Sequence, residues 1–332
     1  MFKGKKILIT GGTGSLGKAL TRRLLDEEVD TIRILSRNEN KQVEMDAEFK
    51  NDKLRFFIGD VRDEKRLNTA FEDVDIVFHA AALKHVPVIE YNPFEAIKTN
   101  VIGSQNVIDA CLHEDVGTVV CVGTDKAVSP LNTYGATKLL MEKLFVSSNF
   151  YLNKKKHKTK FIALRYGNVL GSSGSVVPKF IQQIRSKQKI TITDPNMTRF
   201  SLTMKEALDF ILDSAITGKG SEVFIPKLKS YPIIDLKNAL AELVGNTGEK
   251  ITSIRSGEKL HETLINTDEL RYTWEFKGKY IIFNPLLKEK EILKNYPKIK
   301  KVDILNAYSS NTVEKISKVE LKKIMTNAGI LN

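Results

Sequence analysis

The stretch ILITGGTGSLGKAL, residues 7–20, decides the fold that we expect for this chain. An apolar run ends in Gly11, Gly14 and Gly17, spaced three residues apart, and a helical pattern follows directly. Glycines at such positions permit a tight turn and let backbone N–H groups approach a pyrophosphate at the start of a helix. We therefore predict a dinucleotide-binding strand, turn and helix here, in preference to a merely tight turn.

The first half of the chain repeats this alternation of strand and helix. Its near-continuous apolar runs suit strands that are buried on both faces of a parallel sheet. Strands are predicted at 5–10, 31–36, 54–60, 75–81, 118–124 and 160–168, and helices at 15–27, 40–50, 63–73, 93–113 and 134–150. This rhythm predicts an α/β fold of the Rossmann type, a doubly wound parallel sheet that binds ligands at the C-terminal edge of its strands.

The pattern becomes less regular after about residue 168. Further helices are predicted at 178–187, 204–217 and 234–245, with short strand pieces at 189–193 and 221–226. We interpret residues 1–168 as the NADP-binding domain. Residues 169–332 are interpreted mainly as a smaller α/β substrate-binding lobe, interleaved with the first domain, and the Lys-rich tail beyond 285 gives no clear pattern.

The composition narrows the classes of protein to consider. The 332 residues are 42% hydrophobic and 28% charged, which is ordinary for a soluble globular protein. No apolar run approaches the ~20 residues of a membrane span, and the N-terminal apolar segment is too short for a signal peptide. We expect a cytoplasmic protein with no membrane partner.

The net charge of +12 fits nucleic acid, an acidic membrane or an anionic small substrate. The lysines are spread along the chain, and the one dense run, KKKHK at 154–158, is predicted to be a solvated loop. No nucleic-acid motif accompanies it, so we expect no nucleic-acid partner. Cys111 and Cys121 lie in apolar segments and are predicted to be buried free thiols, with no metal-binding spacing.

The end of the second predicted strand selects the cofactor. An acid there would bind the ribose 2′-hydroxyl of NAD, whereas a basic residue suits the 2′-phosphate of NADP. The segment SRNENK supplies Ser36, Arg37 and Lys41 with no acid at the strand tip, so we predict NADP. Asp60 could bind the adenine amino group or cap a helix, and the sequence leaves both open.

Tyr134 and Lys138 in the segment YGATK lie one helical turn apart, so both can face one ligand. A nearby cation and a positive nicotinamide lower the pKa of a tyrosine from its usual value of ~10. The phenolate would then take a proton from a sugar hydroxyl while hydride leaves the same carbon for NADP⁺.

TGGxGxxG together with YxxxK resembles the extended short-chain dehydrogenase/reductase superfamily. Within it, the chain resembles the UDP-N-acetylglucosamine 4,6-dehydratases, most closely the C5-inverting type that opens pseudaminic acid biosynthesis. The similarity spans roughly residues 5–283 and rests on several further motifs: GDVRD (59–63), HAAALKHVP (79–87), TDKA (124–127), RYGNV (165–169), GSVVP (174–178) and RSGEKLHE (255–262).

The resemblance assigns a task to Asp125 and Lys126, which would otherwise be a surface ion pair of little energetic weight. After oxidation at C4, Lys126 would remove H5, provided that burial and neighbouring positive charge make it neutral. Asp125 would protonate the departing O6, which needs a raised pKa, and hydride would return to C6. Thr124 would bind O4 of the substrate, or would merely cap the turn.

The resemblance also implies the remaining contacts. Asn168 and Val176 would touch the nucleotide sugar. Arg199, Arg255 and Glu258 would hold the diphosphate and the ribose, with surface salt bridges as the alternative for the arginines. Lys84 would lie near both cofactor and substrate, or in a solvated loop. The full cofactor set is Gly11, Thr13, Gly14, Ser15, Leu16, Gly17, Ser36, Arg37, Lys41, Asp60, Val61, Ala80, Ala81, Lys84, Tyr134 and Lys138.

Several alternatives stay open. They are a C5-retaining nucleotide-sugar 4,6-dehydratase, a UDP-sugar 4-epimerase, a nucleotide-sensing regulator without catalysis and, on charge alone, a nucleic-acid binder. The chain departs from the dehydratase pattern at Ser173, where relatives often carry arginine, which puts one substrate contact in doubt. Helices at 93–113 and 134–150 are those that form dimers in this superfamily, so we expect a homo-oligomer, either a dimer or a hexamer.

Overall fold

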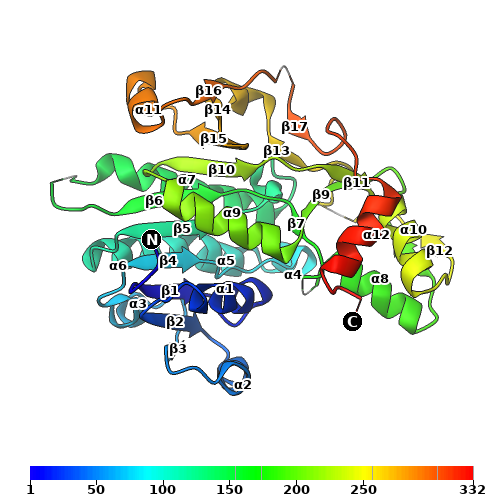
Figure 1. Cartoon of the computed structure of the whole chain (residues 1–332), viewed down its shortest axis with the longest axis horizontal. Helices are drawn as coiled ribbons and strands as arrows, with labels where there is room; N and C mark the ends of the chain where they lie inside the picture. The colour runs from blue at the N-terminus through cyan, green and yellow to red at the C-terminus, as the bar shows by residue number, and fades with distance from the viewer. Residues whose placement is uncertain (154, 173, 256, 305, 332) are drawn as a thin grey trace.

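The structure is a computed structural model that describes residues 1–153, 155–172, 174–255, 257–304 and 306–331. Its centre is a ten-stranded sheet with the order β16-β14-β15-β10-β6-β5-β4-β1-β2-β3 (Figure 1). The parallel strands are β1 (Lys6–Thr10), β2 (Thr31–Ser36), β3 (Leu54–Ile58), β4 (Ile76–His79), β5 (Thr118–Val122), β6 (Lys160–Leu164) and β10 (Glu222–Pro226). The run β3-β2-β1-β4-β5-β6 is the order of doubly wound dinucleotide-binding sheets, so the predicted α/β fold is confirmed.

Helices cover both faces of this sheet because successive side chains of each strand point to opposite sides. In β1, Ile7 and Ile9 enter one hydrophobic core and Leu8 enters the other. The first core includes side chains of α1 (Ser15–Leu25), α2 (Glu39–Phe49) and α9 (Met204–Thr217). The second includes side chains of α3 (Glu64–Phe71), α6 (Gly103–His113) and α7 (Thr133–Tyr151).

Three strands end earlier than predicted. The strands predicted at 54–60, 75–81 and 118–124 stop at Ile58, His79 and Val122. The chain then turns over the C-terminal edge of the sheet. This early end of pairing matters, because the residues just beyond it are the ones predicted to bind cofactor and substrate.

The strand predicted at 160–168 is two strands. β6 ends at Leu164, and β7 (Asn168–Val169) pairs with β9 (Thr198–Leu202) in a separate three-stranded sheet that also contains β11 (Ser230–Pro232). Gly167 permits the crossing, since a Cβ there would lie 2.6 Å from the Phe200 side chain. The break moves Asn168 out of the main sheet and over its edge.

The helix predicted at 93–113 is also divided. It comprises α5 (Pro93–Ala96), a π-helix η1 (Ile97–Ile102) and α6, and it follows a short helix α4 (Val86–Tyr91) that the sequence pattern did not predict. Inside η1, the Asn100 side chain accepts a hydrogen bond from Leu83 N (2.8 Å) and donates one to Leu83 O (3.0 Å). Asn100 thereby ties the loop after β4 to the helices.

Residues after 168 build two regions of the molecule. The strand predicted at 221–226 was grouped with the smaller lobe, but β10 pairs with β6 in the main sheet. The antiparallel strands β14 (Thr273–Phe276), β15 (Lys279–Phe283) and β16 (Lys300–Lys301) extend that sheet further. The domain boundary at residue 168 remains a prediction.

A separate hydrophobic core holds the smaller lobe, which Figure 1 shows at one side of the sheet. Its helices are α8 (Val176–Arg185), α10 (Ile233–Val244) and α12 (Lys318–Asn327). The remaining short elements are β8 (Ile190–Ile192), β12 (Glu249–Ile251), β13 (Thr263–Ile265), η2 (Asp125–Ala127), η3 (Thr267–Tyr272), α11 (Glu289–Asn295) and β17 (Tyr308–Ser309).

Both cysteines are buried and free, as predicted. Burial raises the pKa of the Cys121 thiol to about 12, so it is unreactive near neutral pH. Within the described ranges, no helix has the length and apolar character that crossing a membrane requires.

Candidate active site

A cavity of about 660 Å³ lies over the C-terminal ends of β1, β2, β4 and β5. All sixteen residues predicted for the cofactor line it. The structure thus brings together residues from the glycine loop, the second strand tip, the loop after β4 and helix α7. Their contact with a cofactor remains a prediction.

The glycine loop has the shape that a pyrophosphate requires. Gly11 has a φ of +69°, and a Cβ on Gly17 would lie 2.3 Å from Gly12 O. Helix α1 has Gly14 as its N-cap and no side-chain cap, so its first turn presents backbone N–H groups at the cavity wall. A dinucleotide therefore fits this end of the cavity.

The tip of β2 is basic, as predicted. Arg37 has a side chain that is 53% exposed, and its guanidinium lies 3.7 Å from the Asp60 carboxylate. Asp60 also pairs with Arg62 at 2.7 Å, and although burial acts to raise the pKa of Asp60, the hydrogen bonds from Arg62 lower it. The N-cap of α3 is Asp63, so the helix-cap alternative for Asp60 is wrong.

Tyr134 and Lys138 lie near the start of α7, where Asn132 caps the helix through Gly135 N (2.7 Å). Both side chains are buried. The Lys138 amine donates to Val122 O (2.7 Å), and burial lowers its pKa to about 8. Burial raises the pKa of Tyr134, and the cation that acts against this is Lys126. In the chain without cofactor, the nearby cation therefore does not by itself lower the pKa of Tyr134, and the positive nicotinamide that the prediction also invoked would have to supply that effect.

Asp125 and Lys126 are the first two residues of η2, which follows β5 after Gly123 and Thr124. The Asp125 carboxylate is 1% exposed, and its Oδ1 accepts hydrogen bonds from Thr124 Oγ1 (2.9 Å) and Lys126 Nζ (3.0 Å). Asp125 Oδ2 is buried and has no hydrogen-bond partner among the described residues. The surface-pair alternative is therefore wrong. Thr124 does cap the turn, since its hydroxyl accepts from Lys126 N (3.4 Å).

The surroundings of Lys126 favour the charged form of its amine. Burial acts to lower its pKa, but the carboxylates of Asp125 and Glu262 outweigh burial and raise it above its ordinary value. The expectation that its surroundings favour the neutral amine is wrong for the free chain. Lys126 therefore needs a proton acceptor before it can work as a base.

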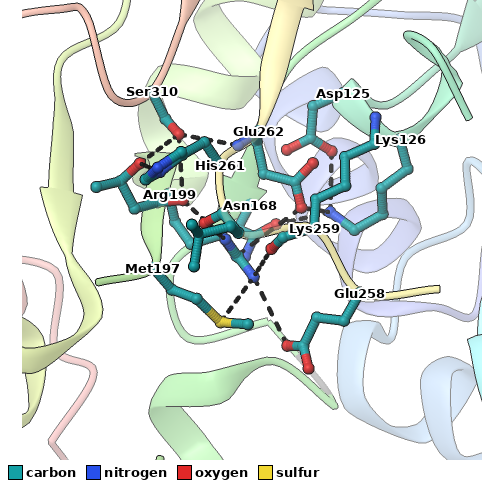
Figure 2. Close-up of polar contacts among 12 residues, drawn as sticks. Asp125, Lys126, Asn168, Met197, Arg199, Glu258, Lys259, His261, Glu262 and Ser310 are labelled. Carbon is teal, nitrogen blue, oxygen red and sulfur yellow. Dashed lines mark hydrogen bonds and ion pairs between the residues drawn. The ribbon is translucent and has the colours of Figure 1, made fainter. Parts of the chain in front are cut away.

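Glu262 is a candidate functional residue that the sequence did not predict. Figure 2 shows it between Lys126 and Arg199. Its Oε1 lies 3.4 Å from Lys126 Nζ and 3.8 Å from Arg199 Nε, and its Oε2 is buried without a hydrogen-bond partner among the described residues. It ends the segment RSGEKLHE, and no local pattern indicates its contact with Lys126, so only the tertiary structure identifies it.

A second cavity, of about 330 Å³, adjoins the first. Lys84, Lys126 and Asn168 line both cavities. The residues predicted for the substrate that line this smaller cavity are Lys84, Asn168, Val176, Arg199, Arg255 and Glu258, whereas Thr124 lines the larger one. The doubtful contact at Ser173 lies outside the described residues.

Two arginines of the smaller cavity differ in their surroundings. Arg199 is buried and donates to the carbonyls of Thr198 (2.8 Å), Lys259 (2.9 Å) and Leu260 (3.0 Å). Its donors are thus engaged by the protein, which favours positioning of the 258–262 segment over contact with phosphate. Arg255 lies near Lys179, a residue not predicted from sequence, and burial together with the Arg255 charge lowers the pKa of Lys179. This end of the cavity is basic and suits an anionic group.

A Rossmann sheet with its glycine loop, and a Tyr134-x-x-x-Lys138 pair beside the cavity over that sheet, define an extended short-chain dehydrogenase/reductase. More particularly, the chain belongs to the polysaccharide biosynthesis protein family, whose model matches residues 7–284. The resemblance drawn from the motifs is thereby confirmed.

The names of similar proteins include two different activities. The chain is 48% identical over 323 residues to the UDP-N-acetylglucosamine 4,6-dehydratase (inverting) of Campylobacter jejuni strain 81-176, covering 96% of this chain and 91% of that one. It is 39% identical over 337 residues to the UDP-glucose 4-epimerase of Rickettsia felis, covering 98% and 97%. Among solved structures, Pen from Bacillus thuringiensis superposes with a TM-score of 0.92 at 39% identity, covering all of both chains.

Proposed function

We propose that this chain is an NADP-dependent UDP-N-acetylglucosamine 4,6-dehydratase of the C5-inverting type. Its product would be UDP-2-acetamido-2,6-dideoxy-β-L-arabino-hex-4-ulose, a nucleotide sugar on a route to pseudaminic acid or a related surface glycan. The observation that carries the proposal is the pair of buried Asp125 and cavity-lining Lys126 beside Tyr134. A 4-epimerase moves hydride at C4 alone and has no task for such a pair.

The described residues divide the proton transfers among them. Bound NADP⁺ would supply the hydride acceptor for C4 and the donor for C6. Tyr134 would take the proton of the C4 hydroxyl, with Thr124 beside it to orient O4. Lys126 lines both cavities and would remove H5, which the C4 ketone makes acidic.

The charge state of the Asp125–Lys126 pair accounts for both of its proposed roles. A proton that moves from Lys126 Nζ to Asp125 Oδ1, 3.0 Å away, leaves a neutral amine and a neutral carboxylic acid. The amine is then the base for H5, and the acid is the donor for O6. Asp125 is 1% exposed and lines neither cavity, so protonation of O6 would require its carboxyl group to turn towards the cavity.

The test is NMR of UDP-N-acetylglucosamine incubated with the purified protein in deuterated water. We expect a 4-keto-6-deoxy product with deuterium at C5, and ring couplings that show inversion. A product with retained C5 configuration would instead identify a C5-retaining dehydratase. The second candidate function is that of a UDP-glucose 4-epimerase, the name of the Rickettsia relative. Conversion of UDP-glucose to UDP-galactose without loss of water would identify this activity.

We propose NADP over NAD because Arg37 stands at the tip of β2. Arg37→Ala should weaken NADPH binding by about tenfold and NADH binding by less than threefold, since only NADPH carries the 2′-phosphate. Fluorescence titration of the two nucleotides measures this. Arg271→Ala, on an exposed residue remote from the cavity, is the control. Equal losses for both nucleotides would contradict a 2′-phosphate contact.

We also propose that the chain forms a homodimer or a larger oligomer through α4, α5, η1 and α7. These adjoining elements expose large apolar side chains, namely Val88, Tyr91, Phe94, Ile97 and Leu140. Tyr91→Glu should lower the mass found by size-exclusion chromatography with light scattering to that of one chain, because it places a charge in the contact. A wild-type mass of one chain at micromolar concentration would contradict the proposal.

We also propose a cytoplasmic location. Both cysteines are buried free thiols, and free thiols are typical of proteins in a reducing compartment.

A further inference from the structure

Glu262 is a buried carboxylate that faces Lys126 and Arg199, two residues of the candidate site. Its side chain is 4% exposed, it lines the smaller cavity, and its Oε2 has no hydrogen-bond partner among the described residues. A buried carboxylate with an unpaired oxygen is costly unless nearby cations compensate. The compensating cations are Lys126, at 3.4 Å, and Arg199, at 3.8 Å.

The backbone holds Glu262 firmly in this place. Glu262 N donates to Ser310 Oγ (2.9 Å), and Ser310 N donates to Glu262 O (2.8 Å). Ser310 in turn bonds to Thr198, the neighbour of Arg199 on β9. The carboxylate is therefore aimed at Lys126 by segments from two distant parts of the chain.

We propose that Glu262 is a positioning residue that holds the Lys126 amine between two carboxylates at the sugar cavity and keeps it protonated until substrate binds. This inference rests on the proposed function, in which Lys126 is the base for H5. Two carboxylates, Asp125 Oδ1 at 3.0 Å and Glu262 Oε1 at 3.4 Å, fix the position of the amine from two sides. Among the described residues, the charged groups that face Lys126 are Asp125, Glu262, Arg199 and Lys259, and Tyr134 is a further titratable group beside it.

Removal of the Glu262 charge has two separable consequences. With one carboxylate fewer, the neutral form of Lys126 becomes more populated at a given pH. The amine also loses one of its two anchors, so it is held less often in the geometry that removes H5. A purely structural role for Glu262 predicts neither effect at Lys126 alone.

The first test measures the amine directly and needs no turnover. Cyanate reacts with neutral amines, so the rate of Lys126 carbamoylation at pH 9, read by mass spectrometry, follows its neutral fraction. In Glu262→Gln this rate should rise about tenfold or more. Loss of a close negative charge lowers the pKa of the amine by about one unit, which raises its neutral fraction about tenfold. Exposed Lys205 is the internal standard, and buried Lys138 reports any general loosening of the fold.

The second test separates the partial reactions. In Glu262→Gln, kcat for the dehydration should fall about tenfold, with KM for UDP-N-acetylglucosamine within threefold of wild type. The ascending limb of its kcat–pH profile should move to lower pH, because Lys126 loses its proton more readily. Glu262→Asp keeps the charge and should keep the limb where wild type has it.

The matched control is Glu222→Gln. Glu222 is equally buried but is held by Tyr296 (2.7 Å), far along the sheet from either cavity. The Glu222→Gln replacement should leave the rate of Lys126 carbamoylation and the kcat–pH profile unchanged. Unchanged Lys126 labelling in folded Glu262→Gln, or equal increases at Lys126 and Lys138, would overturn the inference. Absence of dehydration by wild type would overturn the proposed function, whereas the labelling result would still decide the Glu262–Lys126 contact.

Discussion

Lys126→Ala should bind NADP and UDP-N-acetylglucosamine yet lose water elimination, with kcat reduced by roughly 10²- to 10⁴-fold. In the proposed mechanism, oxidation at C4 does not use Lys126, so reduced cofactor should accumulate on the enzyme. The measurement is single-turnover absorbance at 340 nm, followed beside product formation by NMR. The effect should be large because Lys126 lines both cavities and also contacts the carboxylates of Asp125 and Glu262.

Tyr134→Phe is the contrast that makes this result specific. It removes the phenolic oxygen that we propose takes the C4 proton, so neither reduced cofactor nor product should appear. Turnover of Lys126→Ala at the wild-type rate would disprove its assignment as the base for H5. Loss of the 340 nm signal in both variants would place Lys126 in the first step instead.

Arg165→Met should reduce the free energy of unfolding by roughly 3–5 kcal/mol, because it leaves buried carboxylates without a counter-charge. Arg165 is fully buried and bridges Glu142 (2.6 and 3.0 Å) and Glu269 (2.9 and 3.0 Å), and it also donates to Leu264 O (2.9 Å). Urea denaturation followed by circular dichroism measures the change.

The matched control for Arg165 is an exposed ion pair. Lys318→Met breaks the contact with Glu242 on the surface of the smaller lobe and should lower the free energy of unfolding far less than Arg165→Met does. Equal stability of Arg165→Met and wild type would mean that the carboxylates find other partners or take up protons. Replacement of Glu142 and Glu269 by Gln in the Arg165→Met background should recover part of the loss.

The sequence predicted the dinucleotide end of the molecule well because its signals there are local. Glycine spacing, strand runs and the basic tip at Arg37 each involve a few consecutive residues. The structure places all the predicted cofactor residues around one cavity. The strands predicted past Ile58, His79 and Val122 were too long, because apolar and small residues continue into the loops that carry the site.

Other features depend on contacts between distant segments and could not be predicted. Helix α4 has six residues, too few for a helical period to appear. β10 joins β6 across many intervening residues, which no local pattern indicates. The charge of Lys126 was predicted wrongly for the same reason: Asp125 is its neighbour in sequence, but Glu262, which helps to raise its pKa, comes much later in the chain.

The pairing of Glu262 with Ser310 has a consequence for the order of events during synthesis. The ribosome releases the glycine loop, Tyr134 and Lys126 long before the segment that fixes Glu262, because β17 and Ser310 lie near the end of the chain. Domains fold as units while the chain emerges, N-terminal parts first. A nascent chain therefore acquires the glycine loop, Lys126 and Tyr134 before the segment that fixes Glu262, and in the proposed mechanism the removal of a proton from the sugar reaches its full rate only after residues 308–310 have been added.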